Sequence, residues 1–142
     1  MDLWKINSVF TGCFLFKRST GYAKTIFVVD DNGTNLSTAE EALEDKYKVL
    51  TFNSAARMFA ALGKMIPDLI LLDIEMPVMD GFEALKQLKE NPQYKRIPVI
   101  FLTGTFDLET EEKATAMGAV GFIIKPFSPP MMLECIRKNL YE

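Results

Sequence analysis

Histidine is absent from this chain of 142 residues, and cysteine occurs only twice. Without histidine the chain has no Ser-His-Asp triad and no imidazole ligands for zinc, so these two kinds of site are excluded. Cys13 and Cys135 lie far apart and form no CxxC pair, which favours a reducing, cytoplasmic environment over a disulfide framework. Chemistry in this protein must therefore depend on carboxylates, hydroxyls and lysines.

Long apolar runs and basic stripes are also missing. The longest apolar run of the first 24 residues, Cys13 to Phe16, is far shorter than the ~20 residues of a membrane-spanning helix. The same region has neither the basic start nor the cleavage site of a secretory signal. Net charge is −3, yet residues 1–24 carry four basic side chains and one acidic one, so the remainder is more acidic still. We expect no membrane span and no direct nucleic-acid binding.

Residues 1–24 form an N-terminal extension of unknown role. Its apolar side chains follow neither the period of a strand nor that of a helix. One interpretation is a tail, a cloning remnant or an over-extended start. The other is a docking segment whose aromatic residues cover an apolar patch on this chain or on a second copy. Both remain open.

The whole chain has the apolar and charged content of an ordinary soluble protein of one domain, and strand and helix signals alternate from Thr25 onward. This alternation predicts an α/β fold with a parallel sheet. The expected strands are 25–29, 47–52, 69–72, 97–102 and 119–124. The first helix is expected at about 34–45, and the expected caps of the later ones are Ser54, Asp80 with Glu83 three residues on, Asp107 and Ser128 followed by Pro129.

The predicted helices differ in how apolar their inner faces are. The expected buried positions are Leu36, Ala39 and Leu43; Met58, Phe59 and Leu62; Phe82, Leu85 and Leu88; Leu108, Ala114 and Met117; and Leu133, Ile136 and Leu140. The fourth helix, which Gly118 terminates, is thinly apolar and rich in glutamate. We therefore expect it to be the least firmly held.

Polar side chains follow four of the predicted strands. They are Asp30 and Asp31, Asp73, Thr103 and Lys125. Open parallel sheets bind ligands outside the carboxyl ends of their strands, so these groups are expected to meet at one edge. Three adjacent carboxylates raise one another's pKa values, and a hard divalent cation such as Mg²⁺ relieves this.

The same set predicts a reaction. Asp73 could attack phosphorus, provided that cations neutralise the phosphoryl oxygens. Lys125 supplies one cation and Thr103 a hydroxyl, while Gly104 leaves room for a phosphoryl group. Each residue taken singly is explained as well by an ordinary turn, cap or surface position; their order on consecutive strand ends favours a site.

These residues carry a resemblance to a known family. The chain from about Thr25 to Tyr141 resembles a receiver domain of two-component signalling, the CheY-like family. The matching motifs are Val28-Val29-Asp30-Asp31-Asn32, the stretch from Leu71 to Gly81, Leu102-Thr103-Gly104 and Lys125-Pro126-Phe127. The resemblance implies a flavodoxin-like (βα)5 three-layer sandwich with strand order 2-1-3-4-5, and makes 25–142 a receiver domain.

The resemblance also implies roles. Asp73 would accept a phosphoryl group from a histidine kinase or phosphotransfer protein, with Lys125 and Thr103 beside it. Asp30, Asp31, Asp73 and the backbone carbonyl of Glu75 would hold Mg²⁺ or Mn²⁺. Thr103 and Phe122 would form the switch, and the Lys125–Pro126 bond would be cis.

The implied output is protein contact. The surface of the fourth helix, fifth strand and last helix would change and bind a downstream effector, or a second copy in a phosphorylation-linked homodimer. The chain would not be an enzyme beyond its own phosphorylation and dephosphorylation. It could be a stand-alone regulator or part of a longer one.

Three alternative functions fit these residues less well. A haloacid dehalogenase-type phosphatase needs its nucleophile after the first strand and an aspartate where Glu75 stands. A flavodoxin-type FMN carrier would suffer repulsion between its phosphate and Asp30 and Asp31. A degenerate receiver that only binds partners conflicts with the complete acid, threonine and lysine set.

Overall fold

The structure, a computed structural model, describes residues 23–140, and five parallel strands form one sheet in the order β2-β1-β3-β4-β5. The strands are β1 (Thr25–Val29), β2 (Lys48–Phe52), β3 (Leu69–Asp73), β4 (Val99–Thr103) and β5 (Gly121–Ile124). The helices are α1 (Gly33–Leu43), α2 (Ala55–Leu62), α3 (Gly81–Glu90), α4 (Leu108–Ala116) and α5 (Pro129–Leu140). The predicted three-layer α/β fold and its strand order are confirmed.

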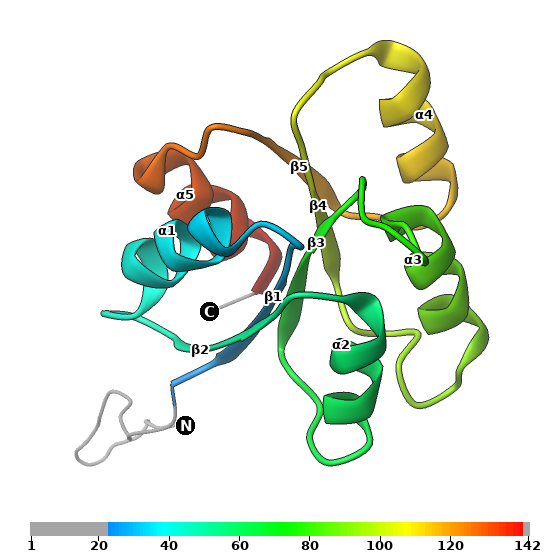
Figure 1. The fold of residues 1–142 in the computed structure, drawn as a ribbon, viewed down its shortest axis with the longest axis horizontal. Coiled ribbons are helices and arrows are strands. Elements are labelled where there is room, and N and C mark those ends of the chain that lie inside the picture. The colour runs from blue at the N-terminus through cyan, green and yellow to red at the C-terminus, as the bar shows by residue number, and fades with distance from the viewer. Residues whose placement is uncertain (1–22, 141–142) are drawn as a thin grey trace, which may run out of the picture.

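Helices cover both faces of the sheet, with α1 and α5 on one side and α2, α3 and α4 on the other (Figure 1). Successive residues of a strand point to opposite faces, so each strand contributes to two cores. Ile26 and Val28 of β1 pack with α1 and α5, whereas Phe27 and Val29 pack with α2 and α3. All five residues of β3 and of β4 are buried, which explains their unbroken apolar sequence.

Polar side chains begin the helices where the sequence predicted them. Ser54, Asp80 and Asp107 each accept a hydrogen bond from the backbone N–H three residues on, over 3.2, 2.8 and 2.8 Å. Asn32 caps α1 in the same way, accepting from Asn35 N over 3.0 Å, although it was not predicted as a cap. Helix α5 begins at Pro129 as expected.

Several element boundaries differ from prediction by one or two residues. Helix α1 ends at Leu43, β4 begins at Val99 and β5 begins at Gly121. Pro98 therefore precedes β4, where its carbonyl accepts from Ile70 N over 3.0 Å. Apolar residues next to a strand can be buried without forming the regular hydrogen bonds of a strand, so apolar content alone overestimates strand length.

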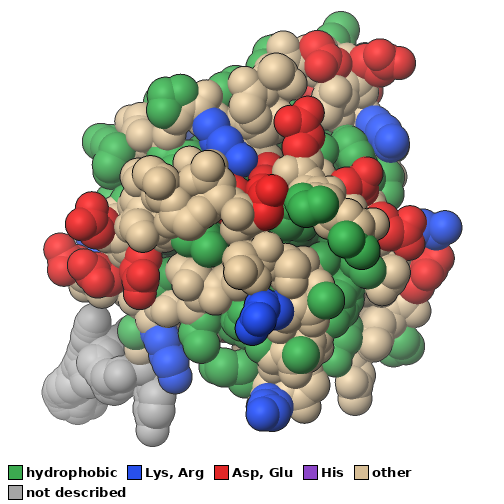
Figure 2. Space-filling view, in the orientation of Figure 1, with side chains coloured by type: hydrophobic (Ala, Val, Ile, Leu, Met, Phe, Trp, Pro, Cys, Tyr) green, Lys and Arg blue, Asp and Glu red, His purple; other side chains and the backbone are tan. Residues whose placement is uncertain are grey.

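Helix α4 is the least buried of the helices. Ala114 is its single buried residue, and Gly118 ends it with a φ of +104°. The expectation that Leu108 lies inward is wrong: its side chain is 64% exposed. In α5 the structure buries Met132, which the sequence reading missed, together with Ile136 and Leu140. Acidic side chains gather over α4 and at the end of α1 on the face seen in Figure 2.

The N-terminal extension lies almost wholly outside the described residues, as do Cys13 and the last two residues of the chain. Both interpretations of the extension stay untested. Strand β1 begins at Thr25, the expected start of the domain. Between residues 23 and 140, no helix combines the length and the apolar character needed to cross a bilayer.

Candidate functional site

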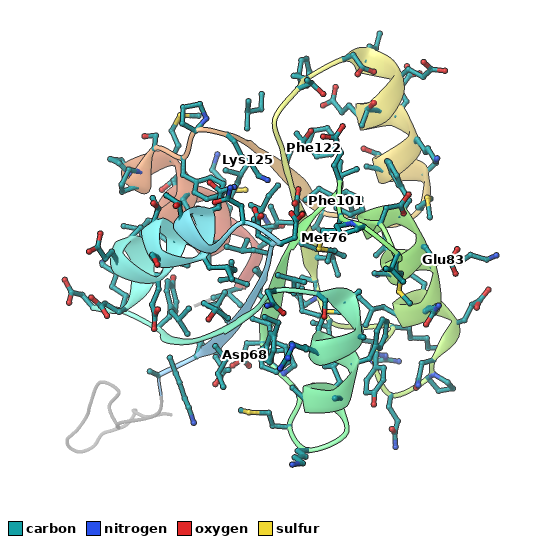
Figure 3. The ribbon with its side chains drawn as sticks, viewed as in Figure 1. Asp68, Met76, Glu83, Phe101, Phe122 and Lys125 are labelled. Atoms are coloured by element: carbon teal, nitrogen blue, oxygen red, sulfur yellow. The ribbon has the colours of Figure 1, made fainter. Side chains whose placement is uncertain are left out.

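The predicted site residues meet at the carboxyl edge of the sheet. Asp30 follows β1, Asp73 and Thr103 end β3 and β4, and Lys125 follows β5. Figure 3 shows Lys125 at the opposite edge from Asp68, which precedes β3. Because neighbouring parallel strands end together, residues up to 95 positions apart in the sequence share one pocket.

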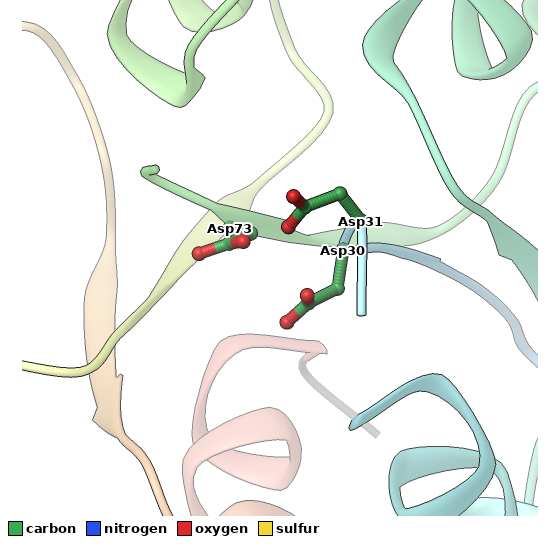
Figure 4. Close-up of side chains that lie close together, drawn as sticks. All are labelled: Asp30, Asp31 and Asp73. Carbon is green, nitrogen blue, oxygen red and sulfur yellow. The ribbon is translucent and has the colours of Figure 1, made fainter. Parts of the chain in front are cut away.

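Three aspartates form an acidic cluster, Asp30, Asp31 and Asp73. One carboxylate oxygen from each lies within 4.8 Å of the others, and Figure 4 shows the three side chains converging. Asp30 and Asp73 are buried, with 0% and 2% of their surface exposed, whereas Asp31 is exposed. The cluster is therefore open on one side and closed on the other.

Lys125 is the positive group that the two buried acids share. Its Nζ lies 2.9 Å from Asp30 Oδ2 and 3.0 Å from Asp73 Oδ1. Burial alone would lower the pKa of this lysine, but its hydrogen bonds to Asp30 and Asp73 outweigh burial and raise the pKa. The lysine thus stays charged and partly neutralises the pocket.

The carboxyl group of Asp73 is costly to ionise. Burial, aided by the charge of Asp30, raises its pKa to about 6, although the hydrogen bond from Lys125 opposes this. Its Oδ1 also accepts from Glu75 N over 3.3 Å. Within residues 23–140, Asp73 Oδ2 has no hydrogen-bond partner, so this oxygen is the one available for a new bond.

The donor set of the cluster fits a hard divalent cation. It offers carboxylate oxygens only, and two of the three acids are buried with a single lysine to balance them. Mg²⁺ and similar ions prefer such ligands. The backbone N–H of Glu75 points to Asp73, which places this residue beside the pocket, and the role of its carbonyl stays a prediction.

The expected switch residues lie on the neighbouring strands β4 and β5, outside the acid cluster, with Phe122 paired to Phe101 and Thr103 to Ile124. Thr103 is buried, and its hydroxyl donates to Thr105 O over 2.8 Å and accepts from Thr105 N over 3.2 Å. The ring of Phe122 is half-buried and contacts the rings of Phe101 and Phe106, with centroid separations of 6.3 and 6.4 Å. Figure 3 shows Phe101 and Phe122. Thr103 is therefore turned along its own loop in this state.

The loop after Asp73 is fixed by Gly81. A Cβ at this position would lie 2.5 Å from Asp73 O and 2.8 Å from Ile74 Cα, so only glycine allows this approach. Val78 turns the chain with a φ of +70°, and Met79 N donates to Pro77 O over 2.8 Å across it. By contrast, a Cβ at Gly104 would meet nothing within 4 Å, so there is open space beside Gly104, as expected for a residue that leaves room for a phosphoryl group.

Two further features complete the site. The Lys125–Pro126 bond is cis, as the resemblance implied. Asn35, which sequence reasoning missed, donates from Nδ2 to Asp30 Oδ2 over 3.2 Å. No motif drew attention to it; the signal that could have done so is its place in the first turn of the helix that follows the acids.

Known proteins resemble this chain over nearly all of the described residues. The model of the response regulator receiver domain matches residues 26–137. A probable cyclic di-GMP phosphodiesterase of Vibrio cholerae is 37% identical over 116 residues, which are 82% of this chain and 26% of that protein. The polar-differentiation response regulator DivK of Brucella ovis is 31% identical, covering 82% of this chain and 96% of DivK. The chemotaxis response regulator CheY4 of Vibrio cholerae has a TM-score of 0.78 and 32% identity, over 83% of this chain and 99% of CheY4.

Proposed function

The chain belongs to the response regulator receiver domain family, and from this premise we propose that Asp73 accepts a phosphoryl group from the phosphohistidine of a kinase or phosphotransfer protein. The observation that carries the proposal is the pair of buried acids, Asp30 and Asp73, held by one lysine beside the exposed Asp31. A buried like-charge pair costs stability, and a purely structural role would not require one.

The transfer makes one bond and breaks one. Asp73 Oδ2, the oxygen without a hydrogen-bond partner among the described residues, bonds to phosphorus. The phosphorus–nitrogen bond of the donor breaks, and the donor imidazole leaves with the electron pair and takes a proton from solvent. Lys125 moves its hydrogen bonds from the carboxylates to the phosphoryl oxygens. Hydrolysis by water later releases phosphate and restores the carboxylate.

A divalent cation belongs to the same proposal. Asp30, Asp31, Asp73 and the carbonyl of Glu75 would hold Mg²⁺ or Mn²⁺. When bound, such an ion supplies the positive charge that lets an anionic carboxylate approach an anionic phosphoryl group. Asp73 must also be ionised to react, and a nearby positive charge lowers a carboxyl pKa that burial has raised.

The response to phosphorylation would run through Thr103 and Phe122. A phosphoryl group brings strong acceptor oxygens to Asp73, and these draw the hydroxyl of Thr103 away from Thr105 O. The ring of Phe122 then turns into the space that is vacated. Helix α4, with Ala114 as its single buried residue, resists rearrangement least.

The changed surface would be the output of the protein. It consists of α4, β5 and α5, and these elements carry exposed apolar side chains at Leu108, Ile124 and Met131, with the exposed Phe106 in the loop before α4. A downstream effector protein, or a second phosphorylated copy, would bind there. A cytoplasmic location is part of this proposal, since a phosphohistidine is formed from ATP.

The proposal does not extend to an enzymatic activity on other molecules. The phosphodiesterase of Vibrio cholerae is named for the whole protein, and this chain spans about a quarter of it. The relation to DivK covers 96% of that regulator. We propose that the chain catalyses only its own phosphorylation and dephosphorylation.

The test is incubation with acetyl phosphate and Mg²⁺, followed by intact-mass measurement. We expect wild type and the control Asp45→Asn, which changes an exposed acid at the end of α1, to gain the mass of one phosphoryl group. Asp73→Asn should gain nothing. An adduct that survives in Asp73→Asn would contradict the assignment of the acceptor.

A further inference from the structure

Asn35 lies in the first turn of α1 and points its side-chain amide at the acid cluster. Its Nδ2 donates to Asp30 Oδ2 over 3.2 Å. Its backbone N–H is already satisfied by the cap residue Asn32, over 3.0 Å. The amide of Asn35 is therefore not needed to begin the helix.

Asp30 is fixed by hydrogen bonds on both of its oxygens. Oδ1 accepts from Asn32 N over 2.9 Å, and Oδ2 accepts from Asn35 Nδ2 and from Lys125 Nζ. The side chain is fully buried, so solvent does not take part. Two donors come from the start of α1 and one from the end of β5, and Asn35 is the side chain that holds Oδ2 from the helix side.

We propose that Asn35 is a positioning residue of the cation pocket, which orients Asp30 for divalent-cation binding. Without the amide, Oδ2 of Asp30 would be held by Lys125 alone. Oδ1 would still accept from Asn32 N, but Oδ2 would follow the flexible lysine, and the carboxylate would lose its fixed alignment with Asp31 and Asp73. Donors that orient a ligating carboxylate typically change metal affinity about 10–100-fold when they are removed.

The choice of asparagine at this position supports the inference. Asparagine is a poorer helix former than alanine, and at position 35 the capping is done by another residue. A helix selected only for stability would favour a different side chain here. The contact with Asp30 supplies the missing reason.

The inference rests on the proposed function, because both concern the same pocket around Asp73. Its test measures Mn²⁺ binding directly, by titration calorimetry on the unphosphorylated full chain. We expect Asn35→Ala to weaken Mn²⁺ binding about tenfold. The control Thr34→Ala, at an exposed neighbouring position of the same turn, should leave binding unchanged.

A second variant separates orientation from a cavity effect. Asn35→Leu has a similar volume but no donor, and it should bind Mn²⁺ as weakly as Asn35→Ala does. In acetyl phosphate reactions, both variants should need more Mg²⁺ for half-maximal rate and reach nearly the wild-type rate at saturation. Their urea unfolding in EDTA should remain a single cooperative transition, which a general loss of structure would not allow.

The outcomes are distinct. Equal Mn²⁺ affinities in wild type and Asn35→Ala, or wild-type affinity in Asn35→Leu, would overturn the inference and leave the proposed function intact. A wild type that binds Mn²⁺ but takes up no phosphoryl group would contradict the proposed function, while a weaker Asn35→Ala would still support the inference. A wild type without Mn²⁺ binding would overturn both.

Discussion

Lys125 donates from Nζ to Asp73 Oδ1 over 3.0 Å, which joins two residues 52 positions apart in the sequence. The same ammonium lies 2.9 Å from Asp30 Oδ2. Both carboxylates are buried, so this lysine is their internal counter-charge. The pocket thus has a positively charged side chain of the protein at its centre.

Removing this lysine should destabilise the metal-free protein. Lys125→Met leaves two buried acids unpaired, and we expect the free energy of unfolding in EDTA to fall by about 2–4 kcal/mol. Millimolar Mg²⁺ should restore much of the loss, because a cation binds only the folded pocket. Urea unfolding with and without Mg²⁺ measures both effects. Lys86→Met, at an exposed position of α3, is the control; a Lys125→Met protein as stable as this control would contradict the prediction.

The raised pKa of Asp73 predicts a pH-dependent cost in the metal-free protein. Between its ordinary value of 3.8 and about 6, the folded state binds more protons than the unfolded state, so this carboxyl lowers stability as pH rises through that window. Asp73→Asn removes the titration. Its advantage over wild type should grow by about 2 kcal/mol between about pH 4 and about pH 7.

Urea unfolding in EDTA at several pH values measures this difference. Titrating groups that do not interact with Asp73 are common to both proteins and cancel, so the difference reports on Asp73 together with the groups that it contacts. The exposed Asp45→Asn should show no such trend. A difference between Asp73→Asn and wild type that stays constant with pH would show that burial does not hold the proton on Asp73.

Gly81→Ala should disturb the pocket through the backbone. The added Cβ would meet Asp73 O and Ile74 Cα, neither of which is a flexible side-chain end. We expect a loss of about 1–3 kcal/mol in unfolding free energy and slower phosphoryl uptake. Gly63→Ala is the matched control, since its φ is −68° and its Cβ would meet Ala60 O at an ordinary 3.4 Å. Equal stability of the two variants would be inconsistent with this packing.

Thr103→Ala should separate phosphorylation from its structural response. The substitution removes the hydroxyl and leaves Asp73 and Lys125 in place, so acetyl phosphate should still label the protein. Hydrogen–deuterium exchange of α4 and β5 should change on phosphorylation in wild type and much less in Thr103→Ala. Ser37→Ala, at an exposed position of α1, should behave as wild type. Loss of labelling together with the exchange response would count against a separate switch role.

Local signals explain why much of the fold was predictable. The β-branched and apolar runs of β1, β3 and β4 are too short for buried helices and fit strands. Ser54, Asp80 and Asp107 mark the starts of helices, because each caps the backbone N–H three residues further on. The pocket was predictable for a related reason. In a parallel sheet, the residue after each strand is placed by topology, so the order of strands fixes which residues meet.

Features that depend on a specific distance were not predictable. Leu108 is exposed because α4 packs against the rest of the domain through Ala114. Periodicity does not tell which of two apolar positions on one helix is the more buried. Asn35 reaches Asp30 only because the turn between them is tight. The hydroxyl of Thr103 could have pointed to Asp73 or to its own loop, and its bond to Thr105 O appears only in coordinates.

The pocket uses the ends of four strands and the first turn of α1, and the outward faces of the other helices contribute nothing to it. Those faces are consequently free to vary. With the output surface proposed at α4, β5 and α5, substitutions on the exposed sides of these elements are expected to change the binding partner and to leave the phosphate chemistry unchanged. Copies of one such domain can therefore acquire different binding surfaces on their helices and keep the same phosphorylation chemistry at the edge of the sheet.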